Sequence, residues 1–329
     1  MMDEPWTVRR LRAWIAPHLK GRGVDSPQAC ADLLLAHALG CERLALYMDA
    51  DRPASARELA VLRALVKRAA DGEPVQYLVG SWGFFGHDFE VDPSTLIPRP
   101  STETLVEQGL ACLRAHGEAA PSQAHRTIVD LCTGTGCVAI SIAAALCAAA
   151  RPRRALAWNS TSANAAPSHQ SDDANALIIG IDVVPGAIEL ARRNAQRIGV
   201  ASAVEFQLGD LDAPLAGRGL EGRVDLLVAN PPYISDAEWA EVPRNVREFE
   251  PASALRGGVD GLDFIRRILR IGPRWLGRRG SVAVEIAASQ GESARALAAA
   301  DRYEEIRVVK DLEGHDRVLV ARAPGASEA

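Results

Sequence analysis

The sequence predicts an α/β protein in which a mostly parallel, seven-stranded sheet follows a small N-terminal helical bundle. From Thr127 onward, short apolar runs alternate with helical patterns, which is typical of a doubly wound parallel sheet. Before position 75, apolar residues instead recur at helical spacing. The chain has 329 residues, long enough for two domains and a sizeable core.

The N-terminal part of the chain carries helix signals. Apolar residues within 8–19 recur on one helical face. Ser26 and Pro27 predict the N-cap and first turn of a second helix. Ser55 and Glu58 form a capping box ahead of a third. We therefore expect a helical bundle over 1–74.

The next segment changes character. Gln76 to Val91 is rich in aromatic residues and glycine, which favours a β-hairpin with a turn near Gly86-His87. The two prolines within Leu96–Pro100 indicate a stiff linker, and Ser101 is expected to cap the following helix. The predicted domains are a helical substrate-docking domain (1–74), a hairpin and linker (75–100) and a cofactor-binding sheet domain (101–329).

Each expected strand of the sheet domain is a short apolar run. The strands are Ile128–Leu131, Ile178–Val183, Val204–Leu208, Val224–Ala229 and Val282–Ile286, with a closing antiparallel pair, Ile306–Val309 and Val318–Ala321. Helices are expected over Cys137–Ala149 and Pro185–Ile198. The stretch 148–176 is rich in Ala, Ser, Asn and Arg without periodicity, which indicates a surface insertion.

Bulk properties exclude some classes of function. A formal net charge of -5 weighs against a protein that lies along nucleic acid. No segment has the apolar length of a membrane span or the pattern of a secretory signal. The six cysteines contain no C-x-x-C pair, so we expect reduced thiols and no metal site. We expect a cytoplasmic monomer that contacts neither membrane nor nucleic acid directly.

A glycine-rich loop follows the first strand of the sheet domain and opens a helix. Gly134 and Gly136 lie at this turn, where the backbone can approach a ligand closely beyond the strand ends. The segment from Gly134 to Ala139 also fits the dinucleotide pattern G-x-G-x-x-A. The loop therefore predicts a cofactor site without deciding between a dinucleotide and a methyl donor.

Two carboxylates follow the next strands. Asp182 ends the second strand, where a carboxylate can accept hydrogen bonds from both ribose hydroxyls. It lies further from Gly136 than the roughly 20 residues expected, and the insertion 148–176 accounts for the excess. Asp210 follows the third strand and would lie beside an adenine amine. Capping of a helix by Asp182, or of a turn by Asp210, is the structural alternative.

The fourth strand separates the two cofactor classes. It ends in Asn230-Pro231-Pro232-Tyr233, whereas no proton relay of the kind a dehydrogenase needs stands out. The Asn230 side-chain oxygen and the Pro231 carbonyl can accept the two N–H bonds of a planar amide or amine, and Tyr233 can pack on the planar group. Two acceptors orient the nitrogen and stabilise positive charge that develops on it. The tetrapeptide predicts methyl transfer from S-adenosylmethionine to a planar nitrogen.

At this point the chain resembles the HemK-type protein-(glutamine-N5) methyltransferases. The resemblance rests on the glycine loop, Asp182, the Asn230–Tyr233 tetrapeptide and these further blocks: Ala31–Leu39, Gly72–Gly80, Phe89–Asp92, Leu96–Glu103, Glu250–Leu255 and Gly258–Leu262. It implies a Rossmann-like class I methyltransferase fold. The implied reaction methylates the glutamine of the Gly-Gly-Gln loop in class I peptide chain release factors, which modulates translation termination.

The resemblance also implies roles for individual residues. The implied cofactor contacts are Thr133, Gly134, Thr135, Gly136, Asp182 and Leu211, together with Cys132, Asp210 and Asn230 beside them. The implied glutamine contacts are Asn230, Pro231, Pro232 and Tyr233. Cys132 stands where release-factor enzymes usually carry glycine, and a contact made by its backbone would tolerate the change.

Three alternatives stay open on the residues alone. Cys132, Cys137 and Phe85–Phe89 are more similar to a sister branch that methylates a ribosomal protein glutamine. A nucleic-acid adenine-N6 methyltransferase uses the same tetrapeptide, although the acidic balance weighs against it. A non-catalytic chain that only docks on release factors is the third, and the intact Asn230 and Asp182 weigh against it.

Overall fold

The chain is described here by a computed structural model that covers residues 5–117, 126–150 and 176–324. It divides into two compact units. The helical unit comprises Met1–Trp82, Val91–Pro93 and Glu241–Pro251, and the sheet unit comprises Gly83–Glu90, Ser94–Ala240 and Ala252–Ala329. Among the described residues, no helix combines the length and apolarity needed to cross a membrane.

The helical unit is built around one apolar core. Its helices are α1 (Val8–Gly21), α2 (Pro27–Leu39), α3 (Ala45–Met48), α4 (Ala56–Ala70), α5 (Val75–Val79) and α9 (Arg244–Phe249). The capping box at Ser55 and Glu58 is confirmed, since both reciprocal hydrogen bonds are present. The predicted start of α2 is confirmed, since Ser26 is its N-cap residue and Pro27 its first residue. Ser26 has a φ of 48°, however, and its side chain makes no cap hydrogen bond.

The hairpin is shorter than predicted. Strands β1 (Ser81–Phe84) and β2 (His87–Glu90) pair around a turn at Phe85 and Gly86, whose φ angles are 48° and 77°. The expectation of extended chain from Gln76 is wrong for the residues now in α5. That helix begins after Pro74, buries Val75 and Leu78 in the helical core, and ends at a left-handed Gly80. Tertiary burial overrides the β preference of this aromatic stretch.

The segment before the sheet also differs in detail. Ser101 lies inside a short 3-10 turn, η1 (Pro100–Thr102), and α6 (Glu103–Gly117) follows directly. The prediction that Ser101 caps this helix is therefore wrong. Pro100 fixes the first position of the turn, and Thr102 donates its N–H to the carbonyl of Arg99. The chain therefore enters α6 through a 3-10 turn, in place of a single capping residue in extended conformation.

The seven-stranded sheet confirms the predicted fold class. Its order is β5-β4-β3-β6-β7-β9-β8, with parallel pairing from β5 to β7 and antiparallel pairing for β7-β9 and β9-β8. The strands are β3 (Arg126–Leu131), β4 (Ala176–Asp182), β5 (Val204–Leu208), β6 (Val224–Ala229), β7 (Leu276–Glu285), β8 (Glu304–Lys310) and β9 (Asp316–Arg322). The predicted insertion 148–176 falls mostly on 151–175, which lie outside the described residues. Its predicted ends belong to regular elements, since α7 (Cys137–Ala150) includes 148–150 and β4 begins at Ala176.

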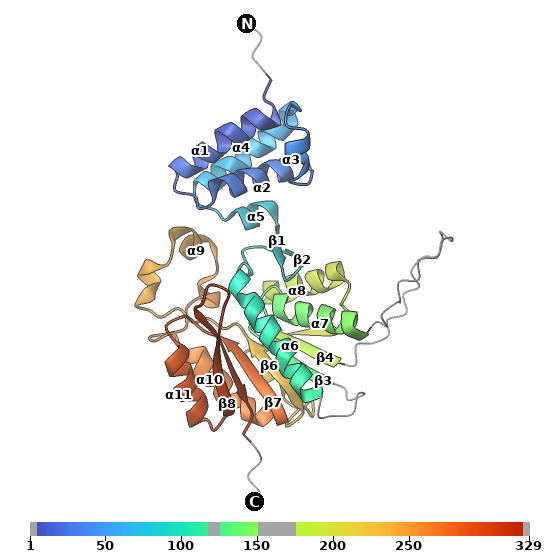
Figure 1. Cartoon of the computed structure of the whole chain (residues 1–329), viewed down its shortest axis with the longest axis vertical. Coiled ribbons are helices and arrows are strands. Elements are labelled where there is room, and N and C mark those ends of the chain that lie inside the picture. The colour runs from blue at the N-terminus through green and yellow to red at the C-terminus, as the bar shows by residue number, and fades with distance from the viewer. Residues whose placement is uncertain (1–4, 118–125, 151–175, 325–329) are drawn as a thin grey trace, which may run out of the picture. The chain divides into compact units, whose positions relative to one another are not determined.

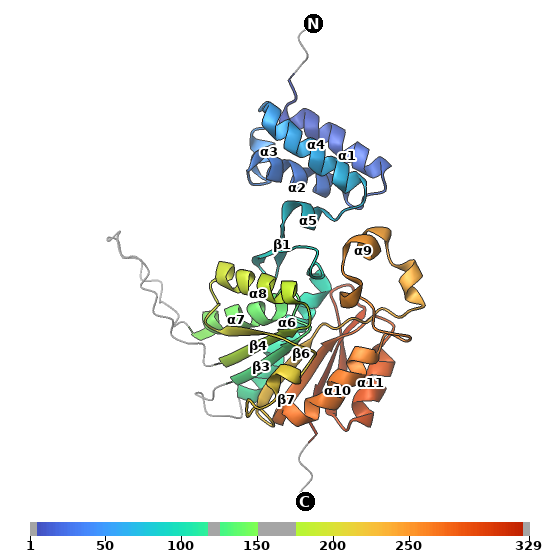
Figure 2. The ribbon, with the colours of Figure 1, turned by 180° about the vertical axis from the view of Figure 1, so that it is seen from behind.

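Successive residues of a strand point to opposite faces of the sheet, and here the residues on both faces are apolar. Helices therefore cover both faces. Ile128 and Val228 belong to one core with α6, α7 and α8 (Pro185–Ile198). Val129 and Leu227 belong to a second core with α10 (Asp263–Trp275) and α11 (Gly291–Ala300). Figures 1 and 2 show these two layers from opposite sides.

The strand register creates one row of functional positions. Leu131 of β3 pairs with both Ile181 of β4 and Ala229 of β6, and Ala229 pairs with Val284 of β7. All four strands are parallel, so the residue after each pair lies at the same edge of the sheet. Those residues are Cys132, Asp182, Asn230 and Glu285.

Candidate functional site

The site begins at the loop between β3 and α7. Asp130 is 1% exposed and its carboxylate accepts from the Thr133 hydroxyl at 2.6 Å and from the Ala139 N–H at 3.2 Å. Burial raises the pKa of Asp130 to about 7, against the lowering effect of these two donors. The carboxylate ties the loop to the first turn of α7, so it acts as the internal support of the loop.

Asp182 ties the same loop to the neighbouring strand. Its two carboxylate oxygens accept from the backbone N–H of Gly134 at 2.9 Å and of Val184 at 3.0 Å. Desolvation raises the pKa of Asp182, and these backbone donors partly offset the rise. An ionised carboxylate offers about four lone-pair sites, so it retains capacity for further donors such as ribose hydroxyls.

The two loop glycines have different surroundings. Both have positive φ, 53° at Gly134 and 78° at Gly136. A Cβ added at Gly134 would meet no atom within 4 Å, whereas one at Gly136 would lie 2.9 Å from the Ile140 side chain and 3.1 Å from those of Ala191 and Phe206. Gly134 lines the pocket and Gly136 does not. Gly136 is needed for close packing beneath the loop.

Two non-glycine residues in the pocket also have left-handed backbones. Cys132 has a φ of 58° and Leu211 a φ of 46°, a region that disfavours side chains with a Cβ. Such conformations concentrate at functional sites. The positive φ at Cys132 explains why glycine, which has no Cβ, would be favoured at this position. Desolvation, together with the nearby Asp182 carboxylate, raises the pKa of the Cys132 thiol, which keeps it protonated.

Asp210 differs from the other two acidic residues of the pocket. Its side chain is 58% exposed and forms an ion pair with Arg267 at 2.7 Å. An exposed pair of this kind contributes little to stability. Asp210 is therefore free to turn towards a ligand at small cost, unlike Asp130 and Asp182.

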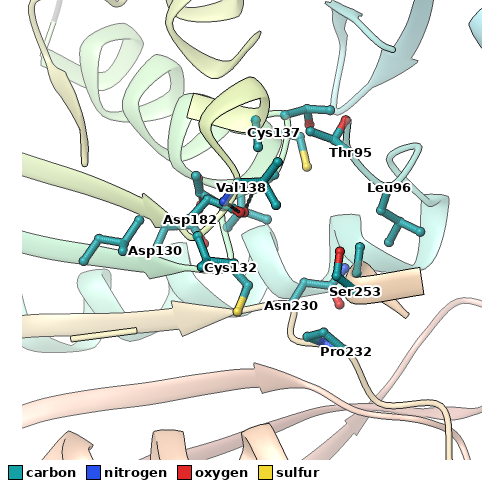
Figure 3. A pocket seen from close by; sticks show the side chains of 18 of the residues that line it. Thr95, Leu96, Asp130, Cys132, Cys137, Val138, Asp182, Asn230, Pro232 and Ser253 are labelled. Atoms are coloured by element: carbon teal, nitrogen blue, oxygen red, sulfur yellow. Dashed lines mark hydrogen bonds between the residues drawn. The ribbon is translucent and has the colours of Figure 1, made fainter. Parts of the chain in front are cut away.

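The pocket collects most of the predicted site residues. Cys132, Thr133, Gly134, Thr135, Asp182, Asp210, Leu211, Asn230 and Pro232 line it, and Gly136, Pro231 and Tyr233 are not among its lining residues. Figure 3 shows Cys132 and Asp182 on one side and Asn230 and Pro232 on another. Three carboxylates line the pocket, and among its described lining residues none is Lys or Arg. This charge suits a cationic sulfonium and opposes the pyrophosphate of a dinucleotide.

The second side of the pocket is held by side chains. The Asn230 amide donates from Nδ2 to the Thr102 hydroxyl at 3.2 Å. The Tyr233 hydroxyl lies 3.5 Å from Oε1 of Glu285, so Tyr233 is directed towards β7. Its backbone carbonyl accepts from the Gln290 side chain at 3.0 Å. These contacts fix the tetrapeptide from both ends.

A glycine-rich segment packs against the same tetrapeptide. A Cβ added at Gly257 would lie 2.8 Å from the Pro232 carbonyl oxygen, and one at Gly261 would lie 2.3 Å from the Tyr233 carbonyl oxygen. Only glycine permits this approach of two backbones. The block Gly258–Leu262 and its neighbour Gly257 therefore shape the tetrapeptide from outside the pocket.

Several residues of the site were not predicted from the sequence. Thr102 and Glu285 contact the tetrapeptide, and Asp130 supports the loop. The pocket is further lined by Ser94, Thr95, Leu96, Pro98, Ser253, Ala254 and Phe264. The position of Glu285, as a lone acid that ends an apolar strand, is the signal that would have found it. Among the described residues, no group of three or more His, Cys, Asp or Glu side chains is placed to hold a metal ion.

Comparison with known proteins adds independent findings. The family model of the PrmC N-terminal domain matches residues 10–80, and that of the RMKL-like methyltransferase domain matches residues 114–246. A protein of Geobacter sulfurreducens named release factor glutamine methyltransferase is 36% identical, over 98% of this chain and 99% of that protein. A protein of the same name from Rhodopirellula baltica is 33% identical, over 96% of each chain.

A solved structure supports the fold alone. The hMettl16 catalytic domain, in complex with the MAT2A 3′UTR hairpin 1, is 12% identical and has a TM-score of 0.52. The match covers 74% of this chain and 76% of that chain. At this identity the similarity indicates a shared fold and nothing about activity.

Proposed function

Since the chain belongs to the release factor glutamine methyltransferases, we propose that its substrate is the glutamine of the Gly-Gly-Gln loop in class I release factors. The chain is an S-adenosylmethionine-dependent protein-(glutamine-N5) methyltransferase. The observation that carries the site assignment is the juxtaposition of the Asn230 tetrapeptide with the acid-lined glycine-loop pocket. The chain matches both relatives over nearly their whole length, and both are named release factor glutamine methyltransferase. This favours a release factor as the substrate over a ribosomal protein or DNA.

The glycine-loop side of the pocket fits the methyl donor. We propose that Asp182 accepts from the ribose hydroxyls and that Asp210 and Leu211 lie beside the adenine. The backbone at Cys132 to Thr135 would hold the amino-acid end of the donor. S-adenosylmethionine supplies an electrophilic methyl group on its sulfonium. The donor would lie at the carboxyl ends of β3 and β4. Asn230 follows the neighbouring parallel strand β6 at the same edge of the sheet.

The tetrapeptide side orients the acceptor nitrogen. A carboxamide nitrogen is a poor nucleophile because its lone pair is delocalised into the carbonyl group. We propose that the Asn230 side-chain oxygen and the Pro231 carbonyl each accept one N–H of the glutamine. The two acceptors favour a pyramidal nitrogen and stabilise the positive charge that develops on it. Pro232 and Tyr233 hold the backbone shape on which both acceptors depend.

We further propose roles for the remaining parts of the chain. Residues 1–74 dock the release factor, residues 75–100 connect this domain to the catalytic domain, and the insertion 148–176 lies outside the reaction. The enzyme acts in the cytoplasm, because its proposed substrate is a translation factor, and we propose that it acts as a monomer. Sedimentation of the full chain with and without a release factor tests the stoichiometry.

A methyl-transfer assay with labelled donor tests the substrate assignment. The full chain is incubated separately with a purified class I release factor, a ribosomal protein fraction and double-stranded DNA. We expect label in the release factor alone. Label in ribosomal protein or DNA, with none in the release factor, would overturn the proposal. A release factor whose Gly-Gly-Gln glutamine is replaced by alanine is the matched control.

A further inference from the structure

A chain of polar contacts leads away from the acceptor side of the pocket. Asn230 donates from Nδ2 to the Thr102 hydroxyl at 3.2 Å. Thr102 in turn makes a side-chain hydrogen bond to Glu285, and the Tyr233 hydroxyl lies 3.5 Å from the same carboxyl group. Thr102 is 1% exposed and Glu285 is fully buried. Water is therefore excluded from the contact between Thr102 and Glu285, in the middle of this series of hydrogen bonds.

The direction of each hydrogen bond follows from the number of protons available. A hydroxyl has one proton, and an ionised carboxylate can only accept. When Glu285 is ionised, the Thr102 hydroxyl donates to it and presents only lone pairs to Asn230. The amide must then turn its NH₂ group towards Thr102. Its carbonyl oxygen is thereby directed away from Thr102.

From this geometry we infer that Glu285 and Thr102 are positioning residues that set the amide orientation of Asn230. The Glu285 carboxylate fixes the direction of the Thr102 hydroxyl, and the hydroxyl fixes which end of the Asn230 amide is available as an acceptor. The reverse orientation would present a donor to the substrate NH₂ group, which can only repel it. The inference rests on the proposed function for the identity of that substrate.

The burial of Glu285 argues that it is not kept for stability. Among the described residues, its Oε2 atom has no hydrogen-bond partner. A buried polar atom without a partner destabilises the folded protein. The charged and titratable groups around it are Arg99, Arg317, Tyr233 and Cys137. Arg317 is itself bonded to Asp311 at 3.0 Å, so it compensates the carboxylate only in part.

Protonation of Glu285 would release the constraint. Burial raises the pKa of Glu285 to about 7, against the lowering effects of Thr102 and Arg317. A protonated carboxyl group can donate to Thr102, and the hydroxyl is then free to donate towards Asn230 and let the amide turn over. The ionised form is the productive one. We therefore expect kcat to fall as the pH falls through this range.

Kinetics of matched variants with a release factor test the inference. We expect Glu285→Gln and Thr102→Val each to lower kcat roughly ten- to hundredfold, less than the roughly 10²–10³-fold cost of a direct transition-state contact, because both residues act through Asn230. KM and the Kd of the methyl donor should change less than about threefold. Thr102→Ser keeps the hydroxyl and should retain kcat. The double variant should be no slower than either single variant, because both act through one chain of contacts. The acidic limb of the kcat profile should disappear in Glu285→Gln.

A second measurement needs no protein substrate, so it separates this inference from the proposed function. The side-chain amide of Asn230 is followed by NMR of full-length protein with ¹⁵N-labelled asparagine, with Asn230→Ser for assignment. We expect the wild-type signal to titrate near the same pH and the Glu285→Gln signal to be independent of pH there. A wild-type signal that does not titrate would overturn the inference.

Other outcomes also decide. If Glu285→Gln lowers Tm but leaves kcat and the acidic limb intact, Glu285 is only structural and the inference is wrong. If Glu285→Gln fails to fold, the pair Thr102→Val and Thr102→Ser carries the same test, and equal kcat for both would overturn it. If no variant or wild type methylates a release factor while the amide signal titrates, the proposed function fails and the positioning role stands.

Discussion

The two sides of the pocket are built in different ways. On the side of β3 and β4, backbone N–H groups donate to two carboxylates. Gly134 and Val184 donate to the half-buried Asp182, and Ala139 donates to the buried Asp130. On the side of β6 and β7, single side chains hold one another, and the proposed acceptor oxygen belongs to Asn230. On the β3 and β4 side, a side chain can be replaced without loss of donor binding wherever only its backbone contacts the donor. On the β6 and β7 side, replacement of one of the interacting side chains should be enough to lower activity.

The largest effect is expected on the tetrapeptide side. Asn230→Ala removes a proposed acceptor for the substrate N–H and should lower kcat by roughly 10²–10³, the usual cost of one transition-state contact. Single-turnover kinetics at saturating donor measure it. Asp236→Ala, which removes only an exposed ion pair with Arg256 just after the tetrapeptide, is the control. Unchanged turnover in Asn230→Ala would remove the catalytic role assigned to this residue.

A smaller effect is expected at the carboxylates of the donor side. Asp182→Ala removes a charged acceptor that also holds the loop, so the Kd of S-adenosylmethionine should rise roughly ten- to hundredfold, which corresponds to about 1.5–3 kcal/mol. Asp210→Asn is the matched control, because Asp210 is exposed and paired with Arg267. It should change the Kd only a few fold. Calorimetric titration would contradict this account if the two variants bound equally well.

Stability of the free protein separates the two loop glycines. Gly136→Ala combines an unfavourable φ with contacts under 3.2 Å to three side chains, whereas Gly134→Ala has the unfavourable φ alone. We expect the free energy of unfolding to fall by roughly 2–4 kcal/mol for Gly136→Ala and by about 1–2 kcal/mol for Gly134→Ala. Denaturant titrations of both variants measure the difference. Equal losses would show that packing beneath the loop is loose.

The smallest effect is expected at Cys132. Cys132→Gly relieves the positive φ but removes a partly buried side chain, and the two changes oppose each other within about 1 kcal/mol. If the donor is contacted through the backbone here, its Kd should change less than about threefold. Cys137→Ala, on α7, is the control for loss of a nearby thiol. A tenfold loss of affinity confined to Cys132→Gly would assign a direct contact to the thiol.

The strands of the sheet were predictable because each is a short apolar run between turn signals. The predicted bounds of β5, β6 and α8 match those of the structure. The helix α5 was missed because its aromatic and β-branched residues favour a strand locally, and only packing against the helical core decides otherwise. Local sequence patterns therefore predict an element correctly where tertiary packing agrees with the local conformational preference.

The site was predictable only in part for a similar reason. Asn230 and Asp182 follow directly from their strands and have recognisable chemistry. Thr102 and Glu285 lie far from Asn230 in the sequence, and neither belongs to a motif with a known mechanism. Glu285 lies at the same sheet edge as Asn230 because Ala229 and Val284 are paired in parallel strands. That register is a tertiary fact, which no local pattern of the sequence contains.

The central claim is that the pocket delivers a methyl group to a glutamine side-chain amide. Tandem mass spectrometry of a release factor after incubation with the full chain and S-adenosylmethionine tests it most directly. The account predicts one added methyl group, located on the side-chain nitrogen of the Gly-Gly-Gln glutamine and formed roughly 10²–10³-fold more slowly with Asn230→Ala. A methyl group on any other residue, or one formed at the wild-type rate with Asn230→Ala, would contradict it.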